Sequence, residues 1–445
     1  MKHVLKGRRS LAIAAAVTVA AGLGVATSAN AITGGSHGGG HPGISSAPWG
    51  TVDGQTVDLY TLRSGHDMTV NVMTFGATIQ SIKVPDKRGH ITNVALGHPT
   101  LSDYVGDFMQ QHTGVGWPIP GGSGDTYFGA TIGRYANRIG DHSFTMNCSD
   151  CSNNGVTYTF PANNGSTTLH GGDLGWNTKV WSATPLTDPH SVGVTLTLTS
   201  PDGDMGFPAA MTTSVTYTVT DDNQLKIAYD TTNNEATGGK ATVVNLTNHT
   251  YFNLGGEASG PVFDQLLAIN ANSYSPIDTD FIPTPPYTVP VTGTPFDFRA
   301  PKPIGQDLTN VSMPDGTAGT PTGPTYKQLV IAHGYDHNWV LNGSGNRLAA
   351  VAQDPGNGIT LRAYTDQPGV QVYSGNFLVG DMTGTSGHIY RQTSAFTLET
   401  QHFPDTPHHI GQAGWPSVVL DAGKTFSSTT SYKFTTEGHG LHVSF

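Results

Sequence analysis

The sequence predicts an all-β fold, a large antiparallel β-sandwich, and three observations favour it. The 445 residues include 57 Gly and 28 Pro, so about one residue in five disfavours a helix interior. Only 12% of the residues are charged, against about 25% in an ordinary soluble domain, which excludes a coiled coil, a helical bundle and a charge-rich disordered chain. Thr, Val, Tyr and Phe recur in short alternating runs, which is the pattern of half-buried strands.

Residues 1–31 have the features of a secretory signal peptide. A basic region ends at Arg9, an apolar stretch follows from Leu11 to Val25, and Ala29-Asn30-Ala31 supplies the small residues of a cleavage site. The alternative is an uncleaved membrane anchor, but the apolar stretch is shorter than the roughly 20 residues of a membrane span. We therefore expect cleavage after Ala31 and a secreted protein, with the export route, general secretory or twin-arginine, left open.

The charge of the mature chain bears on its partners. The predicted signal peptide holds four of the 21 Lys and Arg residues and none of the 32 Asp and Glu residues, so its removal changes the net charge from −11 to −15. Such a surface repels nucleic acids and anionic lipids. We expect no nucleic acid partner, and no membrane partner once the signal peptide has been removed.

Residues 32–48 form the next predicted segment, a Gly-rich flexible linker. His37 and His41 in this segment would bind a metal only weakly, and a solvated spacer is the simpler interpretation. From Trp49 onward no second linker interrupts the chain, so residues 49–445 are predicted to form one catalytic domain.

Within this domain, strand signals recur at short intervals. Three segments alternate clearly between apolar and polar residues, at Val194–Leu198, Val215–Val219 and Ile359–Tyr364. The polar residues 221–223 separate two strand-like runs and predict a hairpin turn. The one convincing helix start lies at Thr100–Tyr104, and the helix is short. No internal repeat indicates a propeller or a solenoid.

The two cysteines, Cys148 and Cys151, are separated by only two residues. In an exported protein, a disulfide bond between them is the favoured state. Zinc would require two further ligands at matching spacing, and a thioredoxin motif would require a βαβ context, which the sequence does not show. The pair falls where a hairpin turn is expected, between strands around Phe144 and Tyr158.

Several segments place polar side chains next to glycine or among apolar neighbours. Taken singly, each has a structural explanation: a lone strand histidine is more often a hydrogen-bonded core residue, and a lone arginine is more often part of an ion pair. A buried glutamate in an apolar strand is harder to explain in this way, because burying a carboxylate is costly. As a set, these amides, charged groups and imidazoles resemble a sugar-binding site: Asn137, Arg138, His170, His249, Asp336, Gln371 and Glu399.

Seven segments in order make the resemblance specific. They read FGATIGRYANRI (Phe128–Ile139), TLHGG, NHTYFNL, PFDFR (Pro295–Arg299), YDHNWVL, PGVQVYSGNF and LETQHFPDTPH. With the strands on either side they cover roughly Val57–Phe434, and the chain resembles the aldose 1-epimerase (galactose mutarotase) family. The resemblance implies the large antiparallel supersandwich of that family, which agrees with the strand periodicity.

The resemblance also implies a role for each site residue. Glu399 corresponds to the general base and His249 to the general acid that open and close the ring of a free aldose such as glucose or galactose. Asn137, Arg138, His170, Asp336 and Gln371 correspond to residues that bind the sugar hydroxyls, and Thr250 and Tyr251 are expected to line the same pocket. The reaction requires Glu399 ionised and His249 protonated, and it needs no metal and no cofactor.

Other activities remain as alternatives. An epimerase for sugar phosphates should show more basic residues and no export signal. A glycoside hydrolase usually needs two carboxylates, with Asp336 as the candidate partner of Glu399, and a silent sugar-binding module should lack the glutamate or the histidine. Residues 106–127 are longer than the family pattern requires, and we expect them to shape the rim of the pocket. The sequence does not reveal the preferred aldose or the oligomeric state.

Overall fold

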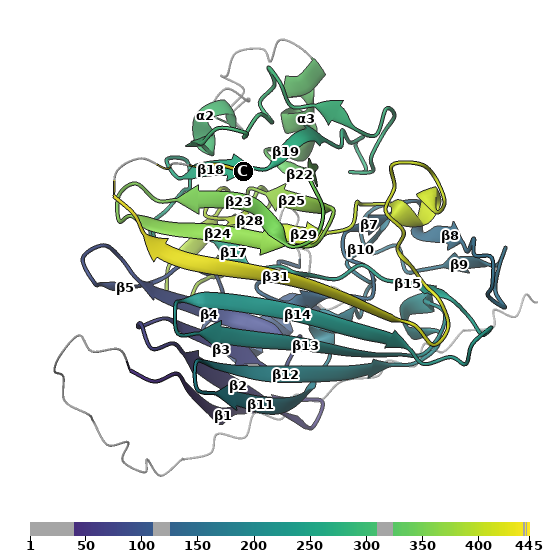
Figure 1. The fold of residues 1–445 in the computed structure, drawn as a ribbon, viewed down its shortest axis with the longest axis horizontal. Helices are drawn as coiled ribbons and strands as arrows, with labels where there is room; N and C mark the ends of the chain where they lie inside the picture. The colour runs from purple at the N-terminus through teal and green to yellow at the C-terminus, as the bar shows by residue number, and fades with distance from the viewer. Residues whose placement is uncertain (1–39, 110–124, 309–323, 439–440, 442) are drawn as a thin grey trace, which may run out of the picture.

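The computed structural model describes residues 40–109, 125–308, 324–438, 441 and 443–445. The predicted signal peptide and residues 32–39 of the predicted linker lie outside these ranges. Among the described residues, one nine-stranded antiparallel sheet forms the broad layer in front in Figure 1. Its strands run in the order β11 (Ser182–Asp188), β12 (Ser191–Ser200), β13 (Met211–Thr220), β14 (Gln224–Asn233), β31 (Thr425–Thr436), β24 (Ile359–Thr365), β23 (Arg347–Gln353), β18 (Leu266–Ile269) and β21 (Lys302–Pro303).

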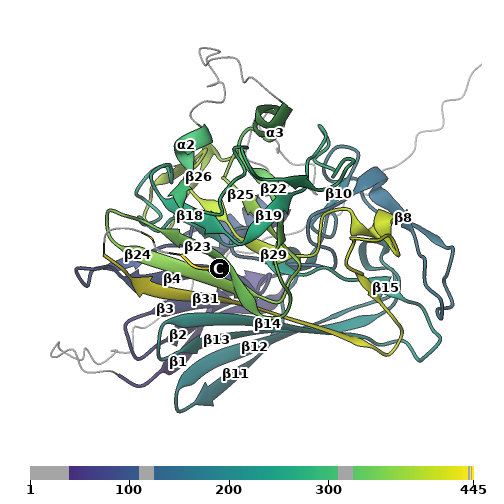
Figure 2. The ribbon, with the colours of Figure 1, turned by 45° about the horizontal axis from the view of Figure 1, so that its top comes forward.

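Two five-stranded sheets lie behind the two ends of this layer, as the turned view in Figure 2 makes clear. The first consists of β1 (Gly43–Val52), β2 (Gln55–Arg63), β3 (Thr69–Met73), β4 (Thr78–Pro85) and β5 (Ile91–Asn93). The second has the order β20 (Val289–Pro290), β19 (Ala271–Tyr274), β22 (Asp336–Leu341), β25 (Gly369–Tyr373) and β29 (Glu399–Gln401). The prediction of an antiparallel β-sandwich is confirmed.

Short strand pairs and helices complete the described part of the chain. The pairs are β6 (Thr131–Ile132) with β16 (Thr247–Asn248), β7 (Arg138–Ile139) with β10 (Thr168–Leu169), β8 (Ser143–Thr145) with β9 (Thr157–Thr159), β15 (Thr242–Val243) with β30 (Val419–Leu420), β17 (Tyr251–Phe252) with β28 (Phe396–Thr397), and β26 (Val379–Thr383) with β27 (Ile389–Arg391). The α-helices are α1 (Leu101–Met109), α2 (Gly305–Leu308) and α3 (Pro324–Ala332). Within the described ranges, no helix has the length and apolar character needed to cross a bilayer.

The side-chain alternation of β13 shows how the sequence builds this sandwich. Val215, Tyr217 and Val219 are buried, while Thr216 and Thr218 between them are partly exposed. The inward residues join one hydrophobic core that extends between the layers and includes Leu62 of β2 and Trp339 of β22. The residues 221–223 form the predicted turn between β13 and β14, which pair antiparallel. The other two alternating segments fall within β12 and β24, as predicted.

The predicted helix is α1, and its first turn is capped reciprocally. The backbone N–H of Thr100 donates to Asp103 Oδ2 (3.2 Å), and the N–H of Asp103 donates to Thr100 Oγ1 (3.3 Å). This arrangement satisfies donors that have no partner within the helix. Helices α2 and α3 were not predicted, because one is only a single turn and the other begins inside a Gly- and Pro-rich stretch.

The first strand corrects the predicted boundary at residue 49. Residues 43–48, assigned to the linker, form the first half of β1 and pair with β2 from Gly43 opposite Arg63 onward. The linker prediction was wrong there because β1 is an edge strand whose residues are mostly exposed, so it carries little apolar alternation. Its backbone pairing and the packing of Ile44 against the core hold it in place.

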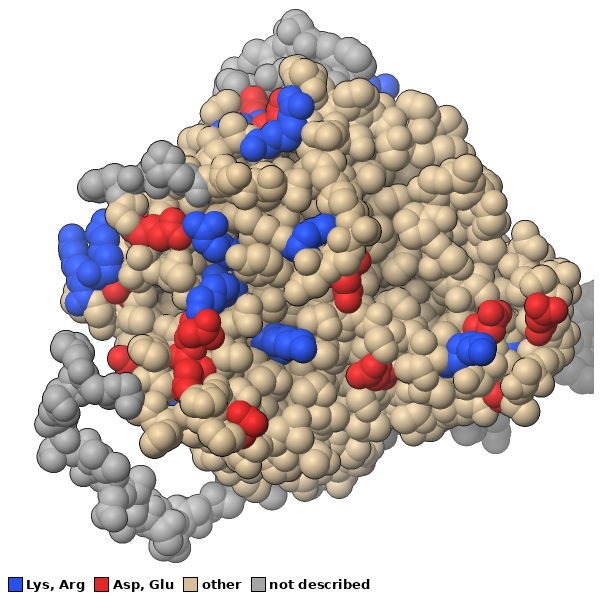
Figure 3. Space-filling view, in the orientation of Figure 1, with Lys and Arg blue, Asp and Glu red and all other residues tan. Residues whose placement is uncertain are grey.

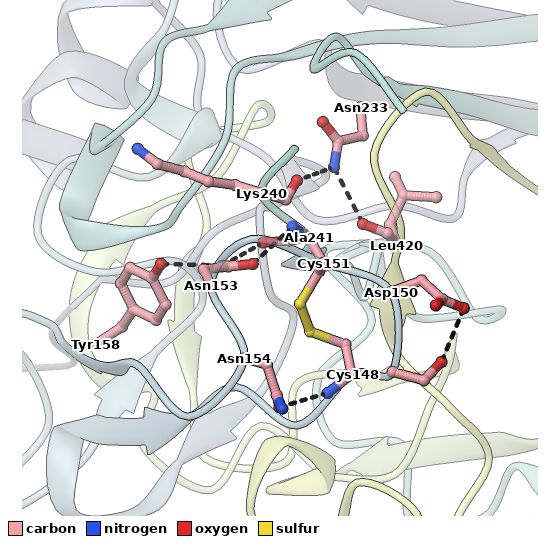
Figure 4. The surroundings of a disulfide bond; sticks show 11 residues. Cys148, Asp150, Cys151, Asn153, Asn154, Tyr158, Asn233, Lys240, Ala241 and Leu420 are labelled. Atoms are coloured by element: carbon pink, nitrogen blue, oxygen red, sulfur yellow. Dashed lines mark hydrogen bonds between the residues drawn. A yellow bond between two sulfur atoms is a disulfide. The ribbon is translucent and has the colours of Figure 1, made fainter. Parts of the chain in front are cut away.

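The predicted disulfide is confirmed, and it lies on the loop between β8 and β9. Cys148 and Cys151 are bonded, with their Cα atoms 5.9 Å apart. Figure 4 shows how neighbouring amides tie this loop to the rest of the fold. The Asn153 side chain donates to the carbonyl oxygen of Ala241 (2.9 Å) and accepts the backbone N–H of the same residue (2.9 Å).

The surface charges agree with the expected partners. In the face shown in Figure 3, Lys and Arg side chains are scattered and interspersed with Asp and Glu, and no continuous basic patch covers the strands. This face therefore offers no electrostatic footprint for a nucleic acid.

Candidate active site

A cavity of about 390 Å³ brings together residues that are far apart in the sequence. Its walls come from the segment before β6, from β7 and β10, from the chain between β16 and β17, and from β22, β25 and β29. The lining residues are Asp125, Thr126, Tyr127, Asn137, Arg138, Asn163, Asn164, Leu169, His170, His249, Tyr251, Phe281, Asp336, Tyr373, Phe377, Leu378 and Glu399. Carboxyl, amide, imidazole and aromatic groups thus share one enclosure.

Glu399 lies at the start of β29 and is only 2% exposed. The strand alternates as the sequence predicts, because the preceding Leu398 packs in the main core while Glu399 faces the cavity. Thr397 Oγ1 donates a hydrogen bond to Glu399 Oε1 (2.8 Å). His249, between β16 and β17, places its Nε2 at 3.5 Å from the same carboxyl oxygen. A proton donor and a proton acceptor therefore face the cavity side by side.

Burial shifts the pKa values of this pair away from their ordinary order. It raises the pKa of Glu399 to about 8, and the nearby Asp336 adds to the rise, while the Thr397 hydrogen bond and Arg138 oppose it. Burial also lowers the pKa of His249 to about 3. The expectation of an ionised Glu399 beside a protonated His249 is therefore corrected: at neutral pH the pair holds one proton, and the carboxyl group carries it. A low-dielectric enclosure favours the two neutral groups over two charges.

His170 follows β10 and approaches His249, with 5.0 Å between the ring centroids. Its Nδ1 accepts the backbone N–H of Asn137 (3.2 Å), so the proton of the neutral ring resides on Nε2. Burial, together with His249 and Arg138, holds the pKa of His170 well below its usual range. The group is thus a neutral hydrogen-bond donor.

The glycines that follow His170 explain the LHGG motif. Gly171 has φ +90°, and a Cβ atom at this position would lie 2.1 Å from the carbonyl oxygen of Gly133. Only glycine permits this close approach, which holds the His170 segment against the chain before Arg134.

Asp336 and Arg138 form the charged wall of the cavity. Arg138 Nη1 lies 4.0 Å from Asp336 Oδ2, and the Gln371 amide donates to Asp336 Oδ1 (2.7 Å). Arg138 Nε also donates to Asn164 Oδ1 (3.1 Å). Burial raises the pKa of Asp336, although Arg138 and Gln371 act in the opposite direction. These contacts fix the guanidinium and the carboxyl group as directional partners for hydroxyl groups.

Two of the predicted binding residues do not line the cavity. Gln371 lies behind Asp336 and orients it. Thr250, predicted to line the pocket, does not, because its hydroxyl donates to Asn248 Oδ1 (2.5 Å) in the buried interior. The other predicted site residues all line the cavity: Asn137, Arg138, His170, His249, Tyr251, Asp336 and Glu399.

Sequence analysis missed several lining residues. Asn163 and Asn164 lie in a segment that reads as an ordinary turn, and Phe281 and Phe377 read as strand or core residues. Of the residues 106–127, those from 110 to 124 lie outside the described ranges, but Asp125, Thr126 and Tyr127 line the cavity. Tyr127 packs its ring against His170, with 4.7 Å between centroids. The position of these residues after a long insertion was the available signal.

Three donor groups approach the spacing of a metal site, since ligand atoms of His170, His249 and Glu399 lie within 4.8 Å of one another. A metal-bound imidazole almost always donates its second ring N–H to a partner. Here His170 Nδ1 accepts an N–H instead, and the buried Nδ1 of His249 has no hydrogen-bond partner. The three residues therefore do not fit a metal centre, whereas they fit proton transfer.

Comparison with known proteins gives a consistent result. A family model described as aldose 1-epimerase matches residues 58–433. The chain is 35% identical over 382 residues to the galactose mutarotase of Homo sapiens, covering 86% of this chain and 95% of that protein. It is 33% identical over 389 residues to the aldose 1-epimerase of Escherichia coli K12, covering 86% and 97%.

Solved structures support the same grouping. A crystal structure of galactose 1-epimerase from Lactobacillus acidophilus superimposes with a TM-score of 0.70 at 26% identity, covering 89% of this chain and 99% of that one. An aldose epimerase homologue from C. elegans has a TM-score of 0.66 at 26% identity, covering 83% and 96%.

Proposed function

The chain belongs to the aldose 1-epimerase family, and on this premise we propose that Glu399 and His249 interconvert the α and β anomers of free aldoses such as glucose and galactose. The chain is an enzyme of carbohydrate isomerisation, as its family membership establishes. The observation that carries the assignment of roles is the 3.5 Å separation of His249 Nε2 and Glu399 Oε1 in a buried, hydroxyl-binding cavity.

The reaction follows from the chemistry of a cyclic hemiacetal. The carboxylate of Glu399 accepts the proton of the C1 hydroxyl while His249 donates a proton to the ring oxygen. The bond between C1 and the ring oxygen then breaks, C1 becomes a carbonyl carbon, and the C1–C2 bond rotates. Closure from the other face returns both protons to their original groups and completes the change of configuration.

The pKa order of the pair is compatible with this cycle. The resting form, with a neutral carboxyl group and a neutral imidazole, contains the same number of protons as the form that opens the ring. It is also the form left after ring opening, when Glu399 has gained a proton and His249 has lost one. The resting pair is therefore already set for ring closure, and an internal proton shift prepares it for opening.

The remaining polar residues orient the sugar. His170 offers a neutral N–H donor next to His249, which suits an oxygen that develops negative charge. Asp336 accepts from sugar hydroxyls and Arg138 donates to them, while Gln371 keeps Asp336 in position. Arg138 is the one Lys or Arg side chain among the described lining residues, and it is already engaged by Asp336. This charge balance favours a neutral aldose over a sugar phosphate.

Polarimetry on freshly dissolved α-anomers tests the proposal. We expect the enzyme to accelerate the change in optical rotation of glucose, galactose, xylose or arabinose above the spontaneous rate, and to leave glucose 6-phosphate close to the spontaneous rate. Acceleration confined to the phosphate would overturn the substrate class.

We also propose that the protein is exported. The support comes from the tripartite pattern of residues 1–31 and from the Cys148–Cys151 disulfide, which is typical of an oxidising compartment.

A further inference from the structure

The cavity has a polar, buried end and an aromatic, exposed end. At the buried end Glu399 is 2% exposed and His249 is 5% exposed, whereas Phe377 at the other end is 37% exposed and Phe281 is partly exposed. The reaction described above requires C1 and the ring oxygen of the sugar to lie at the buried end. The two phenylalanines therefore border the mouth.

Phe377 is an unusual surface residue. Among the described residues, it and the C-terminal Phe445 are the exposed aromatic side chains. Its position is fixed, because its backbone N–H donates to the Tyr373 hydroxyl (2.8 Å) and its ring stacks on that of Tyr373 with an interplanar angle of 19°. An exposed ring that is held rigidly at the mouth of a cavity offers a preformed apolar surface to a ligand.

Phe281 is held beside it by a strained turn. Its φ of +62° lies in the left-handed region, which is costly for a bulky side chain and recurs at ligand-binding positions. Asp278 stabilises the turn, since its Oδ1 accepts the N–H groups of Asp280 (2.9 Å) and Ile282 (3.0 Å). The Phe281 and Phe377 rings lie 6.0 Å apart, edge to face.

The geometry of a pyranose ring tells what this aromatic pair would meet. C1 and C4 lie across the ring from each other, so a sugar with C1 at the buried end directs its C4 oxygen toward the mouth. A second sugar attached at that oxygen leaves through the mouth, and its apolar C–H face can pack on an aromatic ring, whose face carries partial negative charge. A sugar attached at C6 would leave from the side of the ring oxygen instead, toward the buried end.

We propose that Phe281 and Phe377 form a second sugar-binding subsite at the mouth, which takes the non-reacting ring of a 1→4-linked reducing disaccharide. The inference rests on the proposed function, since it places C1 at Glu399 and His249. It extends the substrate class from free monosaccharides to the reducing ends of 1→4-linked sugars, whose hemiacetal remains free.

Kinetics on matched sugars tests the subsite. Mutarotation of maltose, which is 1→4-linked, isomaltose, which is 1→6-linked, and glucose is followed by polarimetry with the wild-type enzyme, Phe281→Leu and Phe377→Leu. We expect the wild type to accept maltose in preference to isomaltose. Each variant should lower the ratio of kcat/KM for maltose to kcat/KM for glucose by about 2- to 10-fold, the range that loss of one aromatic contact implies.

Ile389→Ala is the matched control, because Ile389 is also an exposed apolar residue (51%) but does not line the cavity. Its ratio should equal that of the wild type. A wild-type enzyme that mutarotates glucose but not maltose, or an unchanged ratio in both phenylalanine variants, would overturn the subsite. Failure of the proposed function has a different signature, the absence of any accelerated mutarotation of glucose.

Discussion

At the scale of single residues, the central feature is a carboxyl group that is buried without a neighbouring full ion pair. Glu399 has Thr397 and His249 within contact distance, and Arg138 acts on it only as a secondary influence. Burial of this kind is costly for stability, and its effect is to bring the pKa of an acid close to neutrality. The structure thus explains the glutamate in an apolar strand, which has no role in packing the core.

The first residue-scale prediction concerns Glu399→Gln. The amide keeps the size of the side chain and can still accept the Thr397 hydrogen bond, but it cannot accept a proton. Loss of a positioned base typically costs about 10²–10⁴-fold in rate, so we expect polarimetric turnover of glucose to fall by that order. Glu437→Gln, which breaks the surface pair with Arg362 (2.8 Å), serves as the control. A folded Glu399→Gln enzyme with near-normal turnover would refute the assignment.

The second residue-scale prediction concerns pH. With pKa values of about 8 for Glu399 and about 3 for His249, the pair holds one proton throughout that interval. A second proton below it removes the base, and loss of the proton above it removes the acid. We therefore expect kcat/KM to be level between the two values and to fall on the alkaline side near pH 8.

This pH profile differs from that of an unperturbed pair, for which the level region would lie between about 4.3 and 6.5. The measurement is kcat/KM for glucose at each pH, corrected for the spontaneous rate, with folding monitored by circular dichroism. An alkaline limb near 6.5 would contradict the role of burial.

At the scale of elements, the short strands and turns carry much of the site. His170 follows the two-residue strand β10, and His249 lies between the two-residue strands β16 and β17. Such short strands are weakly specified alone, and their pairing with β7, β6 and β28 positions the side chains. Away from the cavity, the β8–β9 hairpin is held by its disulfide and by Asn153.

The element-scale prediction concerns that disulfide. It closes a loop of sequence separation 3, and the chain-entropy relation for so small a loop gives a stabilisation of at most about 2 kcal/mol. Replacing both Cys148 and Cys151 by Ser should therefore lower the free energy of unfolding in urea by no more than this amount and leave mutarotation unchanged. Ser149→Ala is the control for changes in the same loop. Two titratable thiols in the unfolded, unreduced wild type would contradict the pairing.

At the scale of the whole molecule, the sandwich joins the ends of many strands around one cavity. Residues as distant as Asn137 and Glu399 meet because β7 and β29 lie at the same side of the fold. The described domain begins before residue 49, so the segment between the predicted cleavage site and β1 is short.

The whole-molecule prediction concerns export. We expect the secreted protein to begin at Ile32, because Ala29 and Ala31 form the cleavage pattern. N-terminal sequencing of protein from the culture medium checks this, with Ala31→Trp as a variant whose processing should slow. Secreted protein that still begins at Met1 would contradict the prediction.

The sequence by itself determined the fold class, the family and most of the site. Alternation in β12, β13 and β24 reports burial directly, and side chains such as Glu399 and His170 stand out because glycines or apolar neighbours surround them. These are local properties, so they can be read from adjacent residues. The extent of β1 could not be read in this way, because an edge strand carries little apolar alternation.

Only the tertiary structure decided which side chains share the cavity and which proton state they hold. Thr250 is adjacent to His249 in the sequence, yet it bonds to Asn248 in the interior, while Asn164 and Phe281 arrive from turns that read as ordinary. The proton rests on Glu399 and not on His249 because the cavity excludes water from both groups. Desolvation depends on every segment that encloses a group, and that enclosure exists only after the chain has folded.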